Sequence, residues 1–229
     1  MSVWVVVVAA GSGTRFGAAK QFAPLHGRPL VQWSIEAARR VADGVVLVLP
    51  AASLPAADRL PGADVTVVGA ATRSGSVRCG LAAVPVDAEV VVVHDGARPL
   101  ATPRLFGAVV DAVRSGADAA IPGVAVVDTL KRVRLEPDGA WSTVAATVDR
   151  RDLMAVQTPQ AFRAELLRRV HADGDEASDD AGLVEAAGGT VRVVPGDPCN
   201  LKVTTPEDLV LAEALAASVL HPPAPGGRR

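Results

Sequence analysis

The chain has few aromatic residues and no tyrosine. Aromatics make up 3% of its 229 residues. Proteins that bind single-stranded nucleic acids commonly stack bases on aromatic rings, so this composition disfavours that role. The formal net charge is only −2, which also argues against a general nucleic-acid or membrane-surface function. Any anion site in this chain must therefore be a local cluster of cations.

Cysteine is scarce, and the apolar runs are short. Cys79 and Cys199 form no C-x-x-C motif and indicate no disulfide framework. The apolar run at the N-terminus is too short to cross a bilayer, and no basic segment precedes it. We therefore expect a cytoplasmic protein without a signal peptide or membrane anchor. Hydrophobic residues still account for 49% of the sequence, which is enough for a sizeable core.

The segment from Val3 to Lys20 combines a buried-strand pattern with a glycine loop. Its β-branched apolar run is typical of a strand in a parallel sheet, and Gly11 and Gly13 follow it. Backbone N–H groups in such a turn can bind an anion, and Arg15 and Lys20 supply positive charge nearby. We interpret the loop as a phosphate site. A plain strand-to-helix turn with surface cations is the alternative for the glycines alone.

Two common glycine motifs do not match this loop. No glycine in it is followed by lysine, so it is not a P-loop. A dinucleotide fingerprint requires a third glycine where Phe16 stands. It also requires an acidic residue near the end of the second strand, which ends in Pro50 and Ala51. A nicotinamide-dependent oxidoreductase is therefore the weaker hypothesis.

The rest of the chain alternates strand and helix patterns. Strands are predicted over 45–49, 65–68, 90–93, 117–121 and 191–194, and helices over 29–40, 75–83, 103–114, 162–171, 181–187 and from Thr205 onward. This alternation predicts an α/β fold with a doubly wound, mostly parallel sheet. We expect one domain over 1–220 and a disordered tail over 221–229. Ligands of such sheets bind beyond the carboxyl ends of the strands.

Residues 124–150 interrupt this order. Two stretches of alternating apolar and polar residues flank Glu136-Pro137-Asp138-Gly139, which predicts a long inserted β-hairpin. A hairpin without further partner strands is only marginally stable by itself. We therefore predict a dimerisation arm that packs on another subunit. A hairpin folded over its own domain is the alternative.

Charged residues from distant segments complete the candidate phosphate site. Asp95 directly follows an apolar strand, and a carboxylate there suits Mg²⁺ beside a phosphate. A capped turn in which Asp95 pairs with Arg98 is an equally good interpretation. Lys202 precedes the last helix, and Arg150 lies at the base of the hairpin. Together these residues suit a reaction that brings one phosphate to another. A silent dimeric scaffold is disfavoured, because clustered cations cost stability unless they bind an anion.

Six motifs that occur in order along the chain resemble those of one enzyme family. They are Ala9–Arg15 with Lys20–Phe22, His94–Pro99, Asp128–Lys131, Thr147–Arg150, Gln157–Gln160 and Asn200–Thr204. The set is similar to the 2-C-methyl-D-erythritol 4-phosphate cytidylyltransferases of non-mevalonate isoprenoid biosynthesis. The resemblance covers Val3 to about Leu215 and implies a Rossmann-like, glycosyltransferase-A-like nucleotidyltransferase fold. It further implies transfer of CMP from CTP to the polyol phosphate, Mg²⁺ as cofactor, and a homodimer formed through the hairpin.

The same resemblance implies roles for individual residues. Catalysis would depend on Arg15, Lys20, Arg150 and Lys202. The nucleotide would contact Ala10, Gly11, Ser12, Gly13, Ser76, Asp95 and Ala97. The acceptor would contact Asp95, Arg98, Thr129, Arg150 and Lys202, and Asp95 would also hold the metal. Thr129 and Arg150 would act on the neighbouring subunit's site.

Some positions depart from the family pattern. Ala19 stands where we expect a proline, and Cys199 stands where some members carry an acid, with Asp197 close by. The segment Ser178-Asp179-Asp180 is similar to a Thr-Asp-acid motif, for which helix capping is the simpler interpretation. A cytidylyltransferase for another polyol phosphate, such as ribitol 5-phosphate, is the alternative on the same scaffold.

Overall fold

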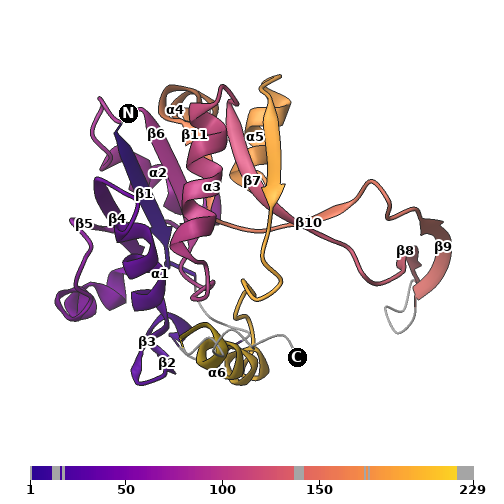
Figure 1. Ribbon diagram of the computed structural model, residues 1–229, viewed down its shortest axis with the longest axis horizontal. Coiled ribbons are helices and arrows are strands. Elements are labelled where there is room, and N and C mark those ends of the chain that lie inside the picture. The colour runs from indigo at the N-terminus through magenta and orange to yellow at the C-terminus, as the bar shows by residue number, and fades with distance from the viewer. Residues whose placement is uncertain are drawn as a thin grey trace, which may run out of the picture.

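A central eight-stranded sheet organises the body of the molecule (Figure 1). The computed structural model describes residues 2–11, 16, 19–136, 142–172, 174 and 176–220, so the predicted tail lies outside it. The strand order is β10-β7-β11-β6-β1-β4-β5, and β12 pairs with β7. The strands are β1 (Val3–Val8), β4 (Gly44–Leu49), β5 (Val65–Val68), β6 (Val90–Asp95), β7 (Ala119–Ala125), β10 (Met154–Val156), β11 (Gln160–Arg163) and β12 (Val191–Pro195).

The sheet is mostly parallel, as the sequence predicts. β1 pairs in parallel with β4 and β6, β4 with β5, and β7 with β12. β11 runs antiparallel between β6 and β7, and β10 runs antiparallel to β7. The sequence pattern misses β10 and β11 and wrongly assigns Phe162 to a helix, which begins only at Ala164. Both strands are too short to show a period that separates strand from helix.

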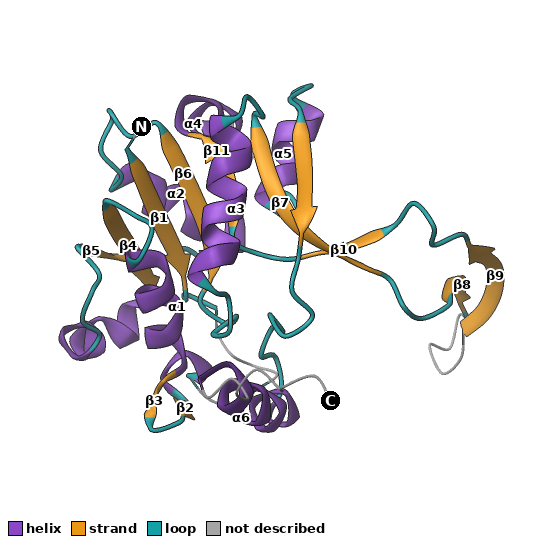
Figure 2. Ribbon diagram, viewed as in Figure 1, coloured by secondary structure: helices purple, strands orange, loops and turns teal. Residues whose placement is uncertain are grey.

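Helices cover both faces of the sheet (Figure 2). α1 (Leu30–Arg39) and α3 (Pro103–Arg114) lie on one face, and α2 (Arg73–Ala82), α4 (Ala164–Ala172) and α5 (Asp180–Ala186) lie on the other. Alternate residues of β1 explain this arrangement. Val5 and Val7 pack with α1 and α3, whereas Val6 packs with the opposite helices, and all three are fully buried. Burial on both faces accounts for the unbroken valine run.

A smaller layer lies beyond the carboxyl edge of the sheet. It holds the 3₁₀ segments η1 (Lys20–Phe22) and η2 (Ala51–Arg59), the strand pair β2 (Pro24–Leu25) and β3 (Arg28–Pro29), and α6 (Pro206–Leu220). The predicted start of α6 is confirmed: Thr205 Oγ1 accepts a hydrogen bond from the Asp208 N–H at 3.4 Å, and the Asp208 carboxylate accepts one from the Thr205 N–H at 2.9 Å. None of the helices in the described ranges is both long and apolar enough to span a bilayer.

The predicted hairpin forms an arm that projects from the body (Figure 1). β8 (Leu130–Leu135) and β9 (Ser142–Val148) pair antiparallel, and most of their side chains are exposed. The first residues assigned to the hairpin belong instead to β7, which continues to Ala125. The arm does not fold over its own domain, so that alternative is wrong. Val133, Leu135 and Val144 remain 49–74% exposed, which leaves an apolar surface for a partner.

Candidate active site

The carboxyl ends of β1 and β6 meet where the strand order reverses. The chain passes from β1 to β4 and β5 on one side and then returns to β6 on the other side. Val8 at the end of β1 lies opposite Asp95 at the end of β6. The loop after β1 and the Asp95 carboxylate therefore leave the sheet next to each other. In doubly wound sheets this switch point is the usual ligand site.

A pocket of about 520 Å³ opens at this edge of the sheet, a size typical of small-molecule sites. Its lining comes from residues 8–11, 20–21, 70–73, 76, 95–97 and 202, with Leu30 and Pro50. Seven predicted site residues are brought together here: Ala10, Gly11, Lys20, Ser76, Asp95, Ala97 and Lys202. The predicted residues Ser12, Gly13 and Arg15 lie outside the described part of the chain.

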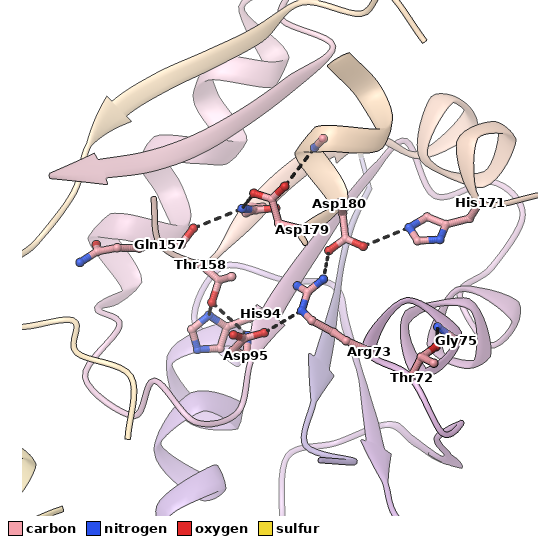
Figure 3. A network of polar contacts seen from close by, with 12 residues as sticks. Thr72, Arg73, Gly75, His94, Asp95, Gln157, Thr158, His171, Asp179 and Asp180 are labelled. Carbon is pink, nitrogen blue, oxygen red and sulfur yellow. Dashed lines mark hydrogen bonds and ion pairs between the residues drawn. The ribbon is translucent and has the colours of Figure 1, made fainter. Parts of the chain in front are cut away.

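Asp95 is the only carboxylate among the described residues that line the pocket. Arg73 Nε lies 3.3 Å from its Oδ1 (Figure 3), and Lys202 Nζ lies 2.6 Å from its Oδ2. Burial by itself would raise the pKa of Asp95, but the charges of Arg73 and Lys202 outweigh it and hold this pKa well below the usual range. The expected turn forms, since the Arg98 N–H donates to the Asp95 carbonyl at 2.9 Å, but the side-chain pair does not: Arg98 Nη1 donates to the Asn200 carbonyl at 2.7 Å instead. Arg98 is also not among the described pocket residues.

Arg73 is a pocket residue that the sequence analysis missed. Its Nη1 donates to Asp180 Oδ2 at 2.9 Å, and Asp180 Oδ1 lies 3.0 Å from His171 Nε2 (Figure 3). The Asp180 side chain is only 1% exposed. Its neighbour Asp179 accepts a hydrogen bond from the Gly182 N–H at 3.0 Å, so the helix-cap interpretation is confirmed for Asp179 alone. Asp180 instead holds Arg73 toward the pocket.

The Asp180 ion pair gives a stability prediction. We expect Asp180→Ala to lower the free energy of unfolding by about 2–4 kcal/mol, because Arg73 would stay largely buried with less countercharge. Urea unfolding measures the change. Glu176→Ala is the matched control, since it removes a carboxylate from the more exposed Arg78 pair, and there we expect a clearly smaller loss. Equal small losses in both variants would contradict the prediction.

The N-terminus of α2 forms one wall of the pocket. Thr72 caps this helix by accepting a hydrogen bond from the Gly75 N–H at 3.0 Å. Ser76 Oγ accepts from the Ala70 N–H at 3.1 Å and donates to the Thr72 carbonyl at 2.9 Å, so it braces the turn before the helix. A Cβ on Gly69 would lie 2.3 Å from the Ala10 Cβ. Only glycine therefore allows this turn to approach the β1 loop, and the helix N-terminus favours an anion there.

Backbone contacts connect the two lysine segments of the pocket. Lys20 Nζ donates to the Val203 carbonyl at 3.1 Å, and the Val203 N–H donates to the Ala97 carbonyl at 2.8 Å. Lys20, Arg73 and Lys202 thus surround a pocket that holds one carboxylate. This excess of positive charge suits a polyphosphate ligand.

The structure does not bring the predicted arm residues into the pocket of their own chain. Thr129 and Arg150 are both exposed, and they lie just before β8 and two residues after β9. The Arg150 guanidinium donates to the Val127 carbonyl. Neither residue is among the described residues that line this pocket.

The donor groups fit a Mg²⁺ ion that arrives with a nucleotide. The described residues contain no group of three or more His, Cys, Asp or Glu side chains placed to hold a metal. Asp197, considered as a second acid, instead accepts a hydrogen bond from the Cys199 N–H at 2.8 Å. Mg²⁺ commonly takes one or two carboxylates and completes its shell with phosphates and water. Asp95 can supply the one carboxylate ligand that such a site needs from the protein.

His94 lies directly behind the pocket and predicts a pH dependence of stability. Burial lowers its pKa to about 4, whereas the unfolded chain should titrate near the ordinary value of about 6.5. Between these values the unfolded state binds more protons, so stability falls as the pH falls. We expect this group to cost about 3 kcal/mol on going from pH 7 to pH 4.

Urea unfolding from pH 7 down to pH 4 measures that loss. His94→Phe should not show the part of this loss that comes from His94. His26→Phe, which replaces an exposed histidine, should still show it. The depressed pKa of Asp95 places its own contribution at lower pH. Parallel curves for the wild type and His94→Phe would contradict the assignment.

A mostly parallel sheet with a cation-lined pocket at its switch point defines a nucleotide-binding protein of the doubly wound α/β class. The comparison with known families makes this specific. Residues 3–218 match the family described as 2-C-methyl-D-erythritol 4-phosphate cytidylyltransferase. The chain belongs to this family, and the resemblance seen in its six motifs is confirmed.

Individual relatives agree with this membership. The chain is 46% identical to the 2-C-methyl-D-erythritol 4-phosphate cytidylyltransferase of Nocardia farcinica, over 93% of this chain and 94% of that protein. It is 42% identical to the bifunctional enzyme IspD/IspF of Nitratidesulfovibrio vulgaris and covers 60% of that longer protein. The crystal structure of the cytidylyltransferase of the same name from Thermus thermophilus superposes with a TM-score of 0.76 at 38% identity, over 94% of this chain and 98% of that one. The predicted fold class is therefore confirmed.

Proposed function

We propose that this chain transfers CMP from CTP to 2-C-methyl-D-erythritol 4-phosphate and releases pyrophosphate. Membership of the family supports the choice of substrates. The structural observation that carries the proposal is the convergence of Lys20, Arg73, Lys202 and Asp95 on one pocket at the switch point. Joining two anions requires such positive side chains, because charge accumulates in the transition state.

The bond changes assign roles to the two lysines of the pocket. An oxygen of the acceptor phosphate attacks the α-phosphorus of CTP, and the bond from that phosphorus to the bridging oxygen of the β-phosphate breaks in line. Lys20, together with Arg15, neutralises the α-phosphate and the pyrophosphate that leaves. Lys202 holds the acceptor phosphate, aided by Arg150 and Thr129 from the arm of a second subunit. Arg98 supports this side through its bond to the Asn200 carbonyl.

The nucleotide would lie between the loop after β1 and the loop after β6, next to the N-terminus of α2. Ala10, Gly11 and Ala97 line the pocket with small residues that allow close approach to their backbone. Ser76 keeps the turn before α2 in place for the base or ribose. When bound, Mg²⁺ would neutralise and orient the phosphates, with Asp95 as its protein ligand.

The same proposal includes a cytoplasmic homodimer of single-domain subunits, with residues 1–220 as the domain. The exposed apolar side chains of β8 and β9 support pairing through the arm. A long two-stranded ladder is marginally stable without a surface to pack on. A partner subunit would supply that surface and bring Arg150 to a pocket.

A pyrophosphate-release assay tests the function. It uses CTP, UTP or ATP with either 2-C-methyl-D-erythritol 4-phosphate or ribitol 5-phosphate, and each mixture contains Mg²⁺ or an excess of EDTA. We expect turnover only with CTP, methylerythritol phosphate and Mg²⁺ together. A higher kcat/KM for ribitol 5-phosphate would overturn the acceptor, and pyrophosphate release without any acceptor would overturn the transfer.

A further inference from the structure

A buried imidazole underlies the loop that carries Asp95. His94 is fully buried at the end of β6 and does not line the pocket. Its Nε2 lies 3.2 Å from the Arg98 carbonyl oxygen and its Nδ1 lies 3.2 Å from Thr158 Oγ1. Since a carbonyl only accepts, Nε2 carries a hydrogen and donates to Arg98. The ring therefore joins the far end of the 94–98 loop to the segment before β11.

Thr158 and Asn200 close this arrangement into a ring of contacts. Thr158 Oγ1 accepts a hydrogen bond from the Asp95 N–H at 3.0 Å (Figure 3). The Thr158 carbonyl accepts from Asn200 Nδ2 at 2.9 Å, and the Asn200 carbonyl accepts from Arg98 Nη1 at 2.7 Å. The 94–98 loop, Thr158 and Asn200 are distant in the sequence. Hydrogen bonds connect all three around the His94 ring.

This ring fixes two groups that do line the pocket. Asp95 is held through its own N–H, and Lys202 follows two residues after the buried Asn200. The Phe106 ring lies 4.9 Å from the imidazole centroid, so α3 packs against the histidine. A shift of His94 would move the Asp95 carboxylate relative to the Lys202 ammonium.

We propose that His94 is a positioning residue of the transfer reaction, which keeps the loop that carries Asp95 and the segment that carries Lys202 in the relative placement that the two reacting phosphates require. This inference rests on the proposed function. The imidazole is not among the described residues that line the pocket, and it acts only through the loops that it joins. Small displacements of groups that hold substrates can cost as much as about 100-fold in rate.

Three substitutions separate this role from simple filling of the core. His94→Phe keeps a ring of similar size but removes both polar contacts. His94→Gln can keep the donor to the Arg98 carbonyl, and His94→Asn can keep an acceptor for the Thr158 hydroxyl. We expect kcat to fall about 10- to 100-fold in His94→Phe and to recover partly in at least one of the other two. The KM for CTP should change less than kcat, because the 10–11 and 70–76 walls of the nucleotide site stay in place.

Val110→Ala is the matched control. Val110 is buried in α3 and, as an apolar side chain, takes no part in the ring of hydrogen bonds, so the variant should lower Tm while kcat stays within about twofold. All assays are run well below the lowest Tm of the set. Normal kcat in His94→Phe would overturn the proposal. If that variant does not fold, normal kcat in both His94→Gln and His94→Asn would do so.

A double-mutant cycle with Lys202→Met tests the route of the effect. If His94 acts through Lys202 and Asp95, His94→Phe should cost much less in the Lys202→Met background than in the wild type. Fully additive losses would overturn positioning. If the wild type itself releases no pyrophosphate from CTP and methylerythritol phosphate, the proposed function fails. If the wild type turns over and the variants match it, only the role of His94 fails.

Discussion

Replacing Lys20 by alanine should lower kcat for pyrophosphate release by about 100-fold or more and leave the fold intact. Its ammonium lines the pocket beside Asp95 and Lys202, where charge builds up on the α-phosphate and the leaving group. Losing about 2.7 kcal/mol of transition-state stabilisation corresponds to this factor. The ammonium also donates to the Val203 carbonyl, so some loss in KM should accompany the fall in kcat.

Steady-state kinetics with both substrates varied measures this effect. Arg104→Ala is the control of equal charge, because Arg104 is exposed on α3 and we expect its kcat to stay near that of the wild type. Thermal unfolding should be nearly the same in both variants. Arg15→Ala should resemble Lys20→Ala if the family resemblance assigns Arg15 correctly. A near-normal kcat in Lys20→Ala would remove this lysine from the mechanism.

The central sheet was predictable because its strands are unusually uniform. β1, β4 and β6 are buried on both faces. Strands of this kind consist of continuous apolar, β-branched residues, and such runs are easy to recognise in the sequence. β11 was not predictable on these grounds. It has only four residues and lies antiparallel between two parallel strands, a place set by tertiary pairing and not by local pattern.

The candidate site was predictable only in part, because some of its residues are placed by tertiary contacts and not by a local sequence pattern. Lys20, Asp95 and Lys202 stand next to strand ends or a helix start, where a switch-point ligand is expected. Arg73 also stands at a helix start, as the first residue of α2, but nothing nearby in the sequence distinguishes it from other surface arginines. Its importance comes from Asp180, which lies 107 positions away in the sequence. His94 was visible within a motif, but its contacts to Arg98 and Thr158 appear only in the folded chain.

The pairing of Asp95 also explains how a cation-rich pocket is tolerated without substrate. Clustered positive charges repel one another and cost stability. In this structure Lys202 and Arg73 share the Asp95 carboxylate, so part of the charge is neutralised internally. Incoming phosphates would take over this role, which frees Lys202 for the acceptor and one Asp95 oxygen for Mg²⁺.

Heterodimers should show whether one arm serves the other subunit. We expect Lys20→Ala and Arg150→Ala homodimers each to retain about 1% of wild-type activity or less, for the reason given for Lys20. In a dimer with one subunit of each kind, the pocket of the Arg150→Ala subunit keeps Lys20 and receives Arg150 from its partner. One of two sites is then intact, so activity should return to about half of the wild type.

Co-expression with two different tags and two-step purification isolates the heterodimer, and pyrophosphate release measures it. A heterodimer of Lys20→Ala with wild type is the control and should also give about half, since one pocket lacks its lysine. Arg150 is exposed and is not among the described residues that line its own pocket, which motivates the expectation that it acts in trans. If Arg150 acts on its own subunit instead, both sites of the mixed dimer carry one defect and activity stays near 1%. Failure of the two tagged chains to co-purify would contradict the homodimer itself.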